Sequence, residues 1–544
     1  MRLLKSLILV FILFQACKEK ELLGEDPYAG GKEALGMKFK NSNPVPNSGN
    51  PGDIVLFKAT GLEKYRGDIV FYINEEKANI INMTDTTIQV QVPENVSTGG
   101  ASMIVNGEVV FGPRFVINGK VGINNSFNVS TGFQYQFSPA SGVRSKGVVF
   151  NFLNTNANTV YVGLFADYNT SATTASPING IVKLSNTGAV VTGTPSFGTA
   201  LSNGGYLSTA IELADGKFIV SGLFNQFQKN KLTNNITRLM PTGVLDTSTI
   251  RVLNDTEDPK KSIDTIPNFN GGVDGTIHKS FLVKHNGQEK IISVGNFKNY
   301  MKIRYDYRPT YDYKRIDYVK IEQIVRMDKD GELDKGYNYD VSTSKGLTPS
   351  NGFLNDAAVE DNGKLIVVGR FTRLQNKTTN NIARLDENGL VDESFNVGSG
   401  ANGEITSIQR SQGKILLTGL FTKFNNQDVN GVVMLNLDGS IDNSFKFKET
   451  IGGRATFAKL LSNDKVLVAG TFEKYDNVKR SGLLVLEKSG EALQAFNNIG
   501  SFEGVIYNVK EVTLASKFTA ILMGNIRRFD NKEVAGIVAV EIKN

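Results

Sequence analysis

The sequence repeats one short signature seven times: an apolar run of β-forming residues that ends in Gly-x-Phe or a close variant. The glycines of this signature, here called the anchor glycines, are Gly163, Gly222, Gly295, Gly369, Gly419, Gly470 and Gly524. In the last copy, Asn525 and Ile526 follow the glycine in place of x-Phe. Successive anchor glycines lie 50 to 74 residues apart. Recurrence at such a period is typical of an array of one supersecondary unit.

The copy around Gly369 shows what one unit contains. An Asn362-Gly363 turn, which favours a hairpin with positive φ, precedes the run Leu365-Ile-Val-Val368 that leads to the anchor glycine. The glycine itself indicates a bulge or a close approach of another backbone. A second apolar run, Ile382-Ala-Arg-Leu385, ends in another tight turn. About four strands in roughly 50 residues is the content of one propeller blade.

These elements resemble the delta-60 repeat family (DUF5122), a β-propeller type. The resemblance covers most of residues 150–544 and rests on Gly-x-Phe, Arg-Leu-x-x-x-Gly and Asp-x-Ser-Phe recurring in one order. It implies an all-β propeller over residues 121–544, and seven anchor glycines predict seven blades. We expect the final strand, around residues 535–542, to pair with residues 121–150 and close the ring, because an open array would expose sheet edges.

Residues 38–118 follow another pattern, in which short alternating runs stand about ten residues apart and turn residues separate them. This spacing predicts a small β-sandwich. Pro46, Gly49 and Gly61, the run Ile88-Gln-Val-Gln-Val92 before Pro93, and Gly99 resemble the IPT/TIG immunoglobulin-like family. In that family the domain is a spacer or an interaction module.

The first residues are typical of a targeting signal. Arg2 and Lys5 precede an apolar run over residues 7–14, which is too short to span a bilayer, and Cys17 follows it as the only cysteine of the chain. This arrangement resembles a bacterial lipoprotein signal. It predicts a signal peptide over 1–16, acyl chains on Cys17 that anchor the chain in outer-membrane lipid, a charged tether over 17–37, and exposure to the cell exterior.

Charge and composition exclude several classes of partner and cofactor. Removal of residues 1–16 takes away Arg2 and Lys5 and no acid, which lowers the formal charge from +6 to +4. So weak a charge predicts no nucleic-acid partner. One cysteine permits no intramolecular disulfide, and His278 and His285, the only histidines, make a zinc site unexpected. We therefore expect no metal and no cofactor, and we interpret both histidines as surface residues.

Recurring aspartates and one insertion are the candidate sites. Asp386, Asp392, Asp438 and Asp442 could be metal ligands or paired carboxylates, but recurrence at repeat spacing favours turn and cap chemistry. The insertion at 298–320 alternates tyrosines with charged residues around Pro309, which predicts a protruding hairpin with one tyrosine face. Such a face could bind a ligand or cover a gap in its own blade. The ligand-binding candidates are Tyr300, Tyr305, Tyr307, Tyr311, Tyr313 and Tyr318.

Three functions fit these features. The layout of lipid anchor, IPT/TIG module and delta-60 propeller resembles accessory surface lipoproteins that capture glycans or peptides for a TonB-dependent transporter and its lipoprotein partner, which implies a non-enzymatic binding protein. A structural or adhesive propeller that binds another envelope protein is an alternative. A propeller glycosidase or lyase is another, but it needs convergent carboxylates, and the sequence offers no unrepeated Asp/Glu pair for that position.

Overall fold

The computed structural model describes residues 34–135, 145–155, 157–169, 178–197, 200–201 and 205–543. These residues form strands and three short 3-10 turns, and none lies in an α-helix. The all-β prediction is therefore confirmed. No helix in the described ranges is long and apolar enough to cross a membrane. The predicted signal peptide, Cys17 and most of the tether lie outside these ranges.

The N-terminal domain encloses one apolar core, whose buried residues run from Met37 to Ile117. Its strands are β1 (Lys38–Phe39), β2 (Ser48–Gly49), β3 (Ile54–Thr60), β4 (Val70–Ile73), β5 (Glu76–Met83), β6 (Thr87–Gln91), β7 (Gly99–Val105) and β8 (Glu108–Ile117). Strand β5 pairs with β4 through its first residues and with β6 through its last, so it joins the two layers. The early strand β2 runs parallel to the last strand, β8.

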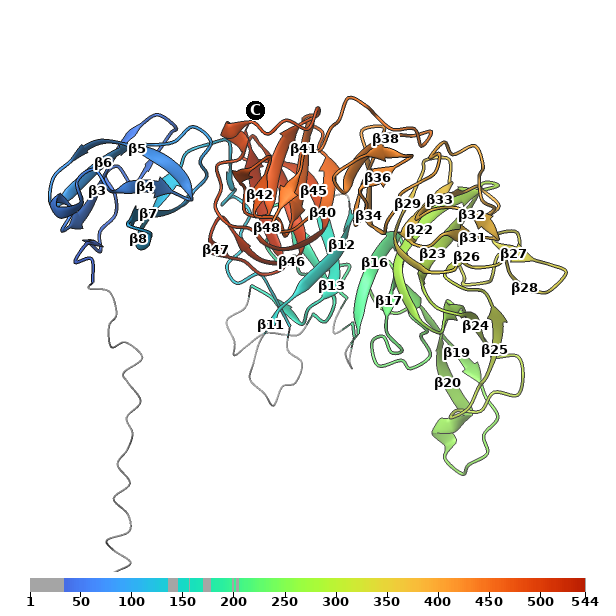
Figure 1. Ribbon diagram of the computed structural model, residues 1–544. Helices are drawn as coiled ribbons and strands as arrows, with labels where there is room; N and C mark the ends of the chain where they lie inside the picture. Colours follow the sequence, from blue (N-terminus) through green and yellow to red (C-terminus); the bar gives the residue numbers. More distant parts are fainter. Residues whose placement is uncertain are drawn as a thin grey trace, which may run out of the picture.

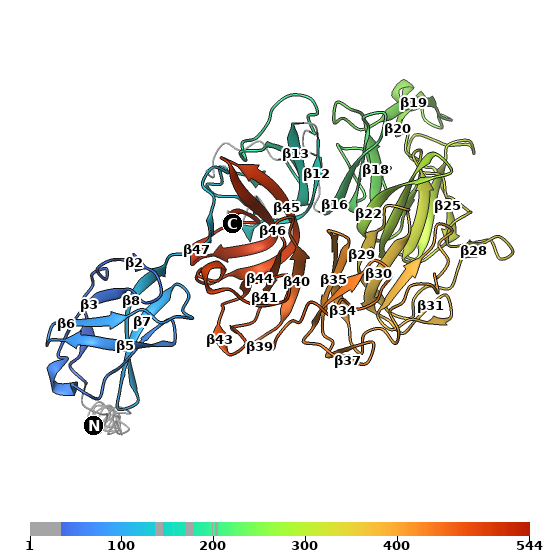
Figure 2. The ribbon, with the colours of Figure 1, turned by 90° about the horizontal axis from the view of Figure 1, so that it is seen from above.

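The rest of the chain folds into a ring of antiparallel sheets, and within the described residues each anchor glycine belongs to a sheet of its own (Figure 2). The first, second and third strands of these sheets are β12 (Val148–Asn154), β13 (Asn158–Leu164) and β15 (Ile181–Ser185); β16 (Tyr206–Glu212), β17 (Phe218–Leu223) and β18 (Ile236–Leu239); β22 (Thr276–His285), β23 (Gln288–Asn296) and β26 (Ile324–Asp328); β29 (Phe353–Val359), β30 (Leu365–Arg370) and β33 (Ile382–Leu385); β34 (Ile405–Ser411), β35 (Lys414–Gly419) and β38 (Val432–Asn436); β40 (Ala455–Leu460), β41 (Lys465–Gly470) and β44 (Leu483–Glu487); β45 (Glu503–Leu514), β46 (Lys517–Phe529) and β48 (Ile537–Ile542).

Each sheet packs on the next, and the last packs on the first through contacts of β45 and β46 with β12. The second strands are apolar on both faces because each lies between two cores. In β30, Leu365 and Val367 belong to the core shared with the preceding sheet, whereas Ile366 and Val368 belong to the core shared with the following one. Alternation of side chains across the strand thus explains the unbroken apolar runs of the sequence.

Shorter strands lie at the periphery of the sheets. They are β10 (Phe133–Tyr135), β11 (Ser145–Lys146), β14 (Asp167–Tyr168), β19 (Thr247–Arg251), β20 (Ile263–Pro267), β21 (Gly272–Val273), β24 (Asn299–Arg304), β25 (Arg315–Lys320), β27 (Tyr339–Asp340), β28 (Lys345–Gly346), β31 (Arg373–Leu374), β32 (Lys377–Thr378), β36 (Lys423–Phe424), β37 (Gln427–Asp428), β39 (Thr450–Ile451), β42 (Lys474–Tyr475), β43 (Val478–Lys479) and β47 (Lys532–Glu533). Strands β19, β20, β24 and β25 form a protrusion from the ring (Figure 1).

The ring is closed by the pairing that the sequence predicts. Strand β9 (Val121–Ile123) enters beside β48, with Val121 opposite Ile542 and Ile123 opposite Val540. The last sheet is thereby completed by a strand from the start of the ring, as Figure 2 shows where the red and teal segments meet. The expected closure by residues 535–542 is confirmed.

The N-terminal domain is docked on the last two sheets by several polar contacts. The Asn498 amide donates to the carbonyl oxygens of Ile117 and Val121 at 3.3 and 3.2 Å, and its backbone carbonyl accepts from the Thr98 N–H at 2.9 Å. Arg480 and Gln494 bind backbone carbonyls of the same domain, Asn95 and Val96 respectively. Asn498 therefore fixes the short connection between the two parts of the chain.

We expect deletion of residues 537–544 to open the ring, lower the melting temperature by many degrees and cause aggregation, because β46 and β9 would each lose a paired neighbour. Thermal unfolding and light scattering would measure both effects. A chain that ends at Lys543 is the matched control and should behave as the intact protein. An unchanged melting temperature in the longer deletion would refute closure by β48.

Candidate functional site

A bulge lies at the same place in the first strand of every sheet. In each case the pairing with the second strand skips one residue, directly after the residue opposite the anchor glycine. The skipped residues, here called the bulge ring, are Phe150, Ser208, His278, Asn355, Thr406, Thr456 and Tyr507. A bulge turns one side chain out of the alternating pattern of its strand.

The anchor glycine makes this bulge possible. A Cβ atom on Gly369 would lie 2.0 Å from the carbonyl oxygen of Phe353, and one on Gly419 would lie 2.2 Å from that of Glu404. The same clash, at 1.9 to 2.1 Å, would occur at the other five anchor glycines. The recurring glycine is thus required by the close approach of two backbones, as predicted from its position in a strand.

All seven residues of the bulge ring line one cavity of about 430 Å³. The other lining residues also come mainly from first strands: Tyr206, Lys279, Asp356, Ser407, Arg454, Val505 and Ile506. The cavity is therefore the central channel of the propeller, and every sheet contributes to its wall. Its volume lies in the range of small-molecule sites.

One side of the channel is aromatic. The ring centroid of Phe150 lies 5.3 Å from that of Tyr507 and 5.1 Å from that of Tyr206. Burial raises the pKa of both tyrosines, so both hydroxyls stay protonated over the physiological pH range. This aromatic arc offers ring faces and two hydroxyl groups to a ligand.

The other side of the channel is polar. The Thr406 and Thr456 hydroxyls donate to the carbonyls of Thr418 and Ala469, and Ser208 donates to the Ile277 carbonyl at 2.8 Å. The Asn355 amide donates to the Ile405 carbonyl at 2.9 Å. Because the hydrogens of these groups are used within the wall, their oxygens remain as acceptors toward the channel. Such a wall suits a ligand that carries hydroxyl donors.

The interpretation of His278 as a surface residue is wrong, because the bulge places it in the channel wall, half-buried. Burial lowers the pKa of His278, while the Leu354 carbonyl and the Asp356 charge oppose this shift. Neighbouring Lys279 forms an ion pair of 2.5 Å with Asp356. Asp356 also accepts from the N–H groups of Ala357 and Ile408, at 2.8 and 3.0 Å. The Asp356 carboxylate is thus held in the channel wall by one ion pair and two hydrogen bonds.

The recurring aspartates have the structural role that their periodicity favours. Asp386 and Asp438 accept backbone N–H bonds within their own turns, and Asp392 and Asp442 do so while also pairing with Lys364 and Lys414. Among the described residues, no three His, Cys, Asp or Glu side chains gather in a way that could hold a metal ion. Turn and cap chemistry is confirmed for these four residues.

The predicted tyrosine hairpin forms, but its tyrosines do not share one face. Strands β24 and β25 pair as expected, while Tyr305, Tyr307, Tyr311 and Tyr313 lie in the connection between them. This connection packs on the neighbouring insertion, where Lys314 pairs with Asp264 at 2.5 Å and Thr310 bridges to Leu253. The strand alternation predicted over residues 305–314 is therefore wrong, because these contacts replace pairing within the hairpin.

The six tyrosines have different environments. Tyr300 is 3% exposed and its hydroxyl donates to the Gly331 carbonyl at 2.8 Å, so it cannot reach a ligand. Tyr305 is half-buried, and burial raises the pKa of its hydroxyl. Tyr307 is exposed beneath the Arg315 guanidinium, and Tyr318 is exposed on β25. Tyr311 and Tyr313, which is 72% exposed, line a hollow of about 780 Å³. A ligand-binding role for the exposed tyrosines stays a prediction.

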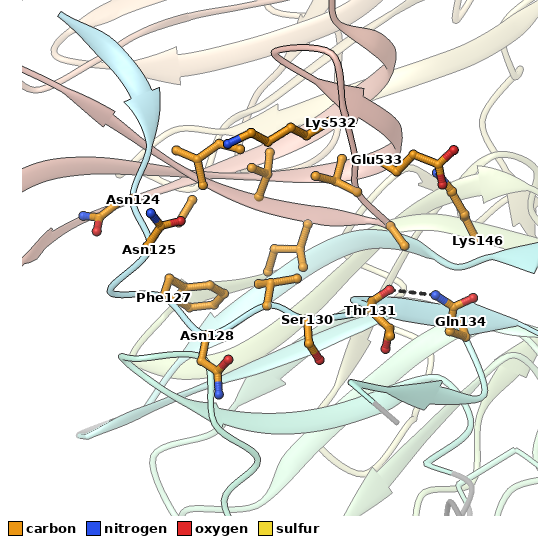
Figure 3. A pocket seen from close by; sticks show the side chains of 17 residues that line it. Asn124, Asn125, Phe127, Asn128, Ser130, Thr131, Gln134, Lys146, Lys532 and Glu533 are labelled. Atoms are coloured by element: carbon orange, nitrogen blue, oxygen red, sulfur yellow. Dashed lines mark hydrogen bonds and ion pairs between the residues drawn. The ribbon is translucent and has the colours of Figure 1, made fainter. Parts of the chain in front are cut away.

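A further hollow of about 610 Å³ lies at the seam where the ring closes (Figure 3). Three of its polar side chains are held by other groups of the protein. The Asn124 amide donates to Thr519, Gln134 donates to the Thr131 carbonyl, and Lys146 donates to the Arg527 carbonyl at 2.8 Å. These three contacts join residues 124, 134 and 146 to their surroundings at the seam, so they contribute to the closure of the ring.

Two family models match parts of this chain. Residues 16–113 match DUF5008, a domain of unknown function. Residues 213–248, 360–395 and 411–445 match DUF5122, a domain of unknown function described as a β-propeller. The propeller class predicted from the delta-60 resemblance is thus confirmed. The IPT/TIG assignment of the N-terminal domain stays a prediction. No curated protein matches the chain.

Solved structures give only distant likenesses. The WD40 β-propeller domain of Doa1 is 13% identical, with a TM-score of 0.38, over 76% of this chain and 98% of that one. An auxiliary nutrient binding protein from Bacteroides ovatus is 10% identical, with a TM-score of 0.22, over 92% of this chain and 99% of that one. A second such protein, from Bacteroides thetaiotaomicron, is 11% identical, with a TM-score of 0.19, over 79% and 96%. Function must therefore be inferred from the channel itself.

Sequence reasoning missed the bulge ring. Its members are Phe, Ser, His, Asn, Tyr and two Thr residues, so no repeated residue type marks the position in the sequence. The available signal was the anchor glycine, which marks the point where a neighbouring first strand must bulge, and the bulge residue stands one position after the residue opposite it. Counting from the glycine to its partner requires the pairing register, which the sequence alone does not supply.

We expect Gly369→Ala to lower the free energy of unfolding by roughly 1–3 kcal/mol, because its new methyl group would overlap the Phe353 carbonyl oxygen. Urea unfolding would measure the change. Gly122→Ala is the control, since no atom lies within 4 Å of a Cβ there and its φ is not in the left-handed region. Equal stability of both variants would contradict the close approach.

The pKa of Asp442 generates a pH-dependent prediction. Burial alone would raise this pKa, but hydrogen bonds from Lys414 and Ser444 outweigh burial and lower the value from 3.8 to about 2. A folded pKa below the unfolded one stabilises the protein above about pH 4, and this stabilisation is lost as the pH falls through about 2. Asp442→Asn should therefore cost roughly 1 kcal/mol at pH 7 and little near pH 2.

Urea unfolding at the two pH values would measure this cost. Asp428→Asn serves as the control, because Asp428 is 86% exposed and its ion pair with Lys423 lies at the surface. A cost for Asp442→Asn that does not change with pH would show that the carboxylate charge contributes nothing.

Proposed function

We propose that this chain is a non-enzymatic surface protein, tethered to outer-membrane lipid through Cys17, whose central channel binds a glycan or peptide for an outer-membrane uptake system. The observation that carries the proposal is the bulge ring, which turns seven side chains of six residue types into one cavity of about 430 Å³. The scaffold around the cavity repeats, while the cavity wall does not. Variation confined to a concave surface is what a binding site requires.

The two sides of the channel suit a saccharide. Tyr507, Phe150 and Tyr206 offer ring faces on which the apolar face of a sugar can stack. The threonine, serine and asparagine oxygens of the opposite side can accept hydrogen bonds from sugar hydroxyls. A polar ligand with one apolar face could thus contact the aromatic side with that face and the acceptor-rich side with its hydroxyl groups.

The absence of enzymatic activity is part of the proposal. A glycosidase needs two carboxyl groups on either side of the scissile bond. Among the described residues that line the channel, Asp356 is the only acidic one, and it is held by Lys279 and two backbone N–H groups. This arrangement favours binding over hydrolysis.

Membrane attachment and transport partners rest on the sequence. The basic start, the short apolar run and Cys17 support lipidation and a position on the cell exterior. The proposed partners are a TonB-dependent transporter and its lipoprotein, to which this chain would deliver its ligand.

A second candidate function is binding of an envelope protein by the protrusion. Tyr311 and Tyr313 are exposed there beside Lys229, Lys231 and Lys260, around the hollow of about 780 Å³. Exposed tyrosines and a rim of charged side chains are common at protein interfaces.

We expect calorimetric titration of the chain with a panel of neutral and acidic oligosaccharides and short peptides to find a ligand that depends on the channel. Tyr507→Ala should weaken its binding about tenfold or more, because stacking on this ring is lost. The double variant Tyr311→Ala/Tyr313→Ala is the control and should bind normally. Loss of binding in the control but not in Tyr507→Ala would refute the channel and favour the protrusion. Release of a shortened product would refute the non-enzymatic assignment.

A further inference from the structure

A second ring of residues surrounds one mouth of the channel, two positions before the bulge ring and at or near the start of each first strand. These residues, here called the mouth ring, are those whose carbonyl oxygen lies against the anchor glycine: Val148, Tyr206, Thr276, Phe353, Glu404, Arg454 and Val505. Two of them carry a charge, Glu404 and Arg454, and they come from neighbouring sheets. Of these two, Arg454 alone lines the channel cavity.

The Glu404 carboxylate accepts a hydrogen bond from the preceding sheet, on the side away from Arg454. The donor is the Asn355 amide, at 2.8 Å, and Asn355 belongs to the preceding sheet, whereas Arg454 belongs to the following one. The Arg454 backbone N–H donates to the Thr471 hydroxyl at 3.3 Å. In the part of the chain that the structure describes, the exposed Arg454 guanidinium forms no ion pair or hydrogen bond.

The remaining charges of the channel cancel. Lys279 and Asp356 neutralise each other at 2.5 Å, and half-buried His278 has a lowered pKa, so it is mostly neutral at pH 7. Arg370, near the same mouth, lies over the Phe353 ring at 5.7 Å and does not line the cavity. Among the described residues that line the cavity, Arg454 is therefore the one charged side chain with no opposite charge paired to it.

Arg454 precedes β40, and Tyr507 lies on β45 of the next sheet, so both side chains line the cavity from adjacent sheets. A planar guanidinium binds a carboxylate through two parallel hydrogen bonds. We propose that the channel binds a saccharide that carries a carboxylate, a uronate, with its ring on Tyr507 and its carboxylate on Arg454. This inference rests on the proposed function and narrows its ligand class.

A saccharide fits better than an acidic peptide. The polar side of the channel presents hydroxyl and amide oxygens as acceptors, from Ser208, Asn355, Thr406 and Thr456, and a sugar supplies several hydroxyl donors in a small volume. An extended peptide would instead need a sheet edge or a longer groove.

The test uses the full chain and two probes, trigalacturonic acid and its fully methyl-esterified form, in which a neutral methyl ester replaces each carboxylate. We expect calorimetry at low ionic strength to show the acid binding about tenfold more tightly than the ester. Arg454→Gln should remove this preference and leave ester binding unchanged, and Arg454→Lys should retain part of it. Arg251→Gln, at an exposed arginine on β19, is the matched control and should behave as the wild type.

Equal binding of acid and ester by the wild-type chain would overturn the uronate inference and leave channel binding intact. A preference for the acid that persists in Arg454→Gln would also overturn it. If an acidic peptide binds in a way that depends on Arg454 and neither saccharide binds, the uronate inference is overturned and the ligand is an acidic peptide. Failure of every saccharide and peptide to bind would contradict the proposed function as well. Unchanged melting temperatures of the variants would verify that they fold.

Discussion

The close contact between each anchor glycine and the carbonyl oxygen of a neighbouring first strand is the constraint on which this propeller depends. It leaves no room for a Cβ atom, and in every sheet it stands directly before a bulge. The repeated glycine and the variable channel lining therefore have the same cause, the bulge in each first strand. The scaffold repeats so that the bulge recurs, and the bulge frees one residue per sheet to differ.

Two further contacts hold this geometry in place. Strand β9 completes the last sheet and pairs with the edge of β48, which would otherwise be left open at the seam. Asn498 then binds the connection just before β9 and fixes the N-terminal domain against the last sheets (Figure 1). The channel thus lies in a propeller whose first strand, β9, is paired with its last, β48. This favours a preformed site over one that closes around its ligand.

The sequence predicts the scaffold better than the site, for physical reasons. The apolar runs, the turns and the anchor glycines are local signals, so the propeller and its closing strand can be expected from them. The sequence does not place His278 in the channel wall. A bulge reverses the side of the strand on which a residue points, and the alternation of polar and apolar residues does not show where a bulge lies. The tyrosine hairpin forms, but the alternation expected over residues 305–314 does not, because contacts with another insertion, such as that of Lys314 with Asp264, replace it.

The proposed binding role rests on a channel with an aromatic side, an acceptor-rich side and the Arg454 guanidinium. The most direct measurement is a crystal structure of the mature chain with the saccharide that titration selects. Our account predicts electron density for a sugar ring against Tyr507, with hydroxyl groups near Asn355 and Thr406. Density confined to Tyr311 and Tyr313 on the protrusion, with nothing bound between the first strands, would contradict it.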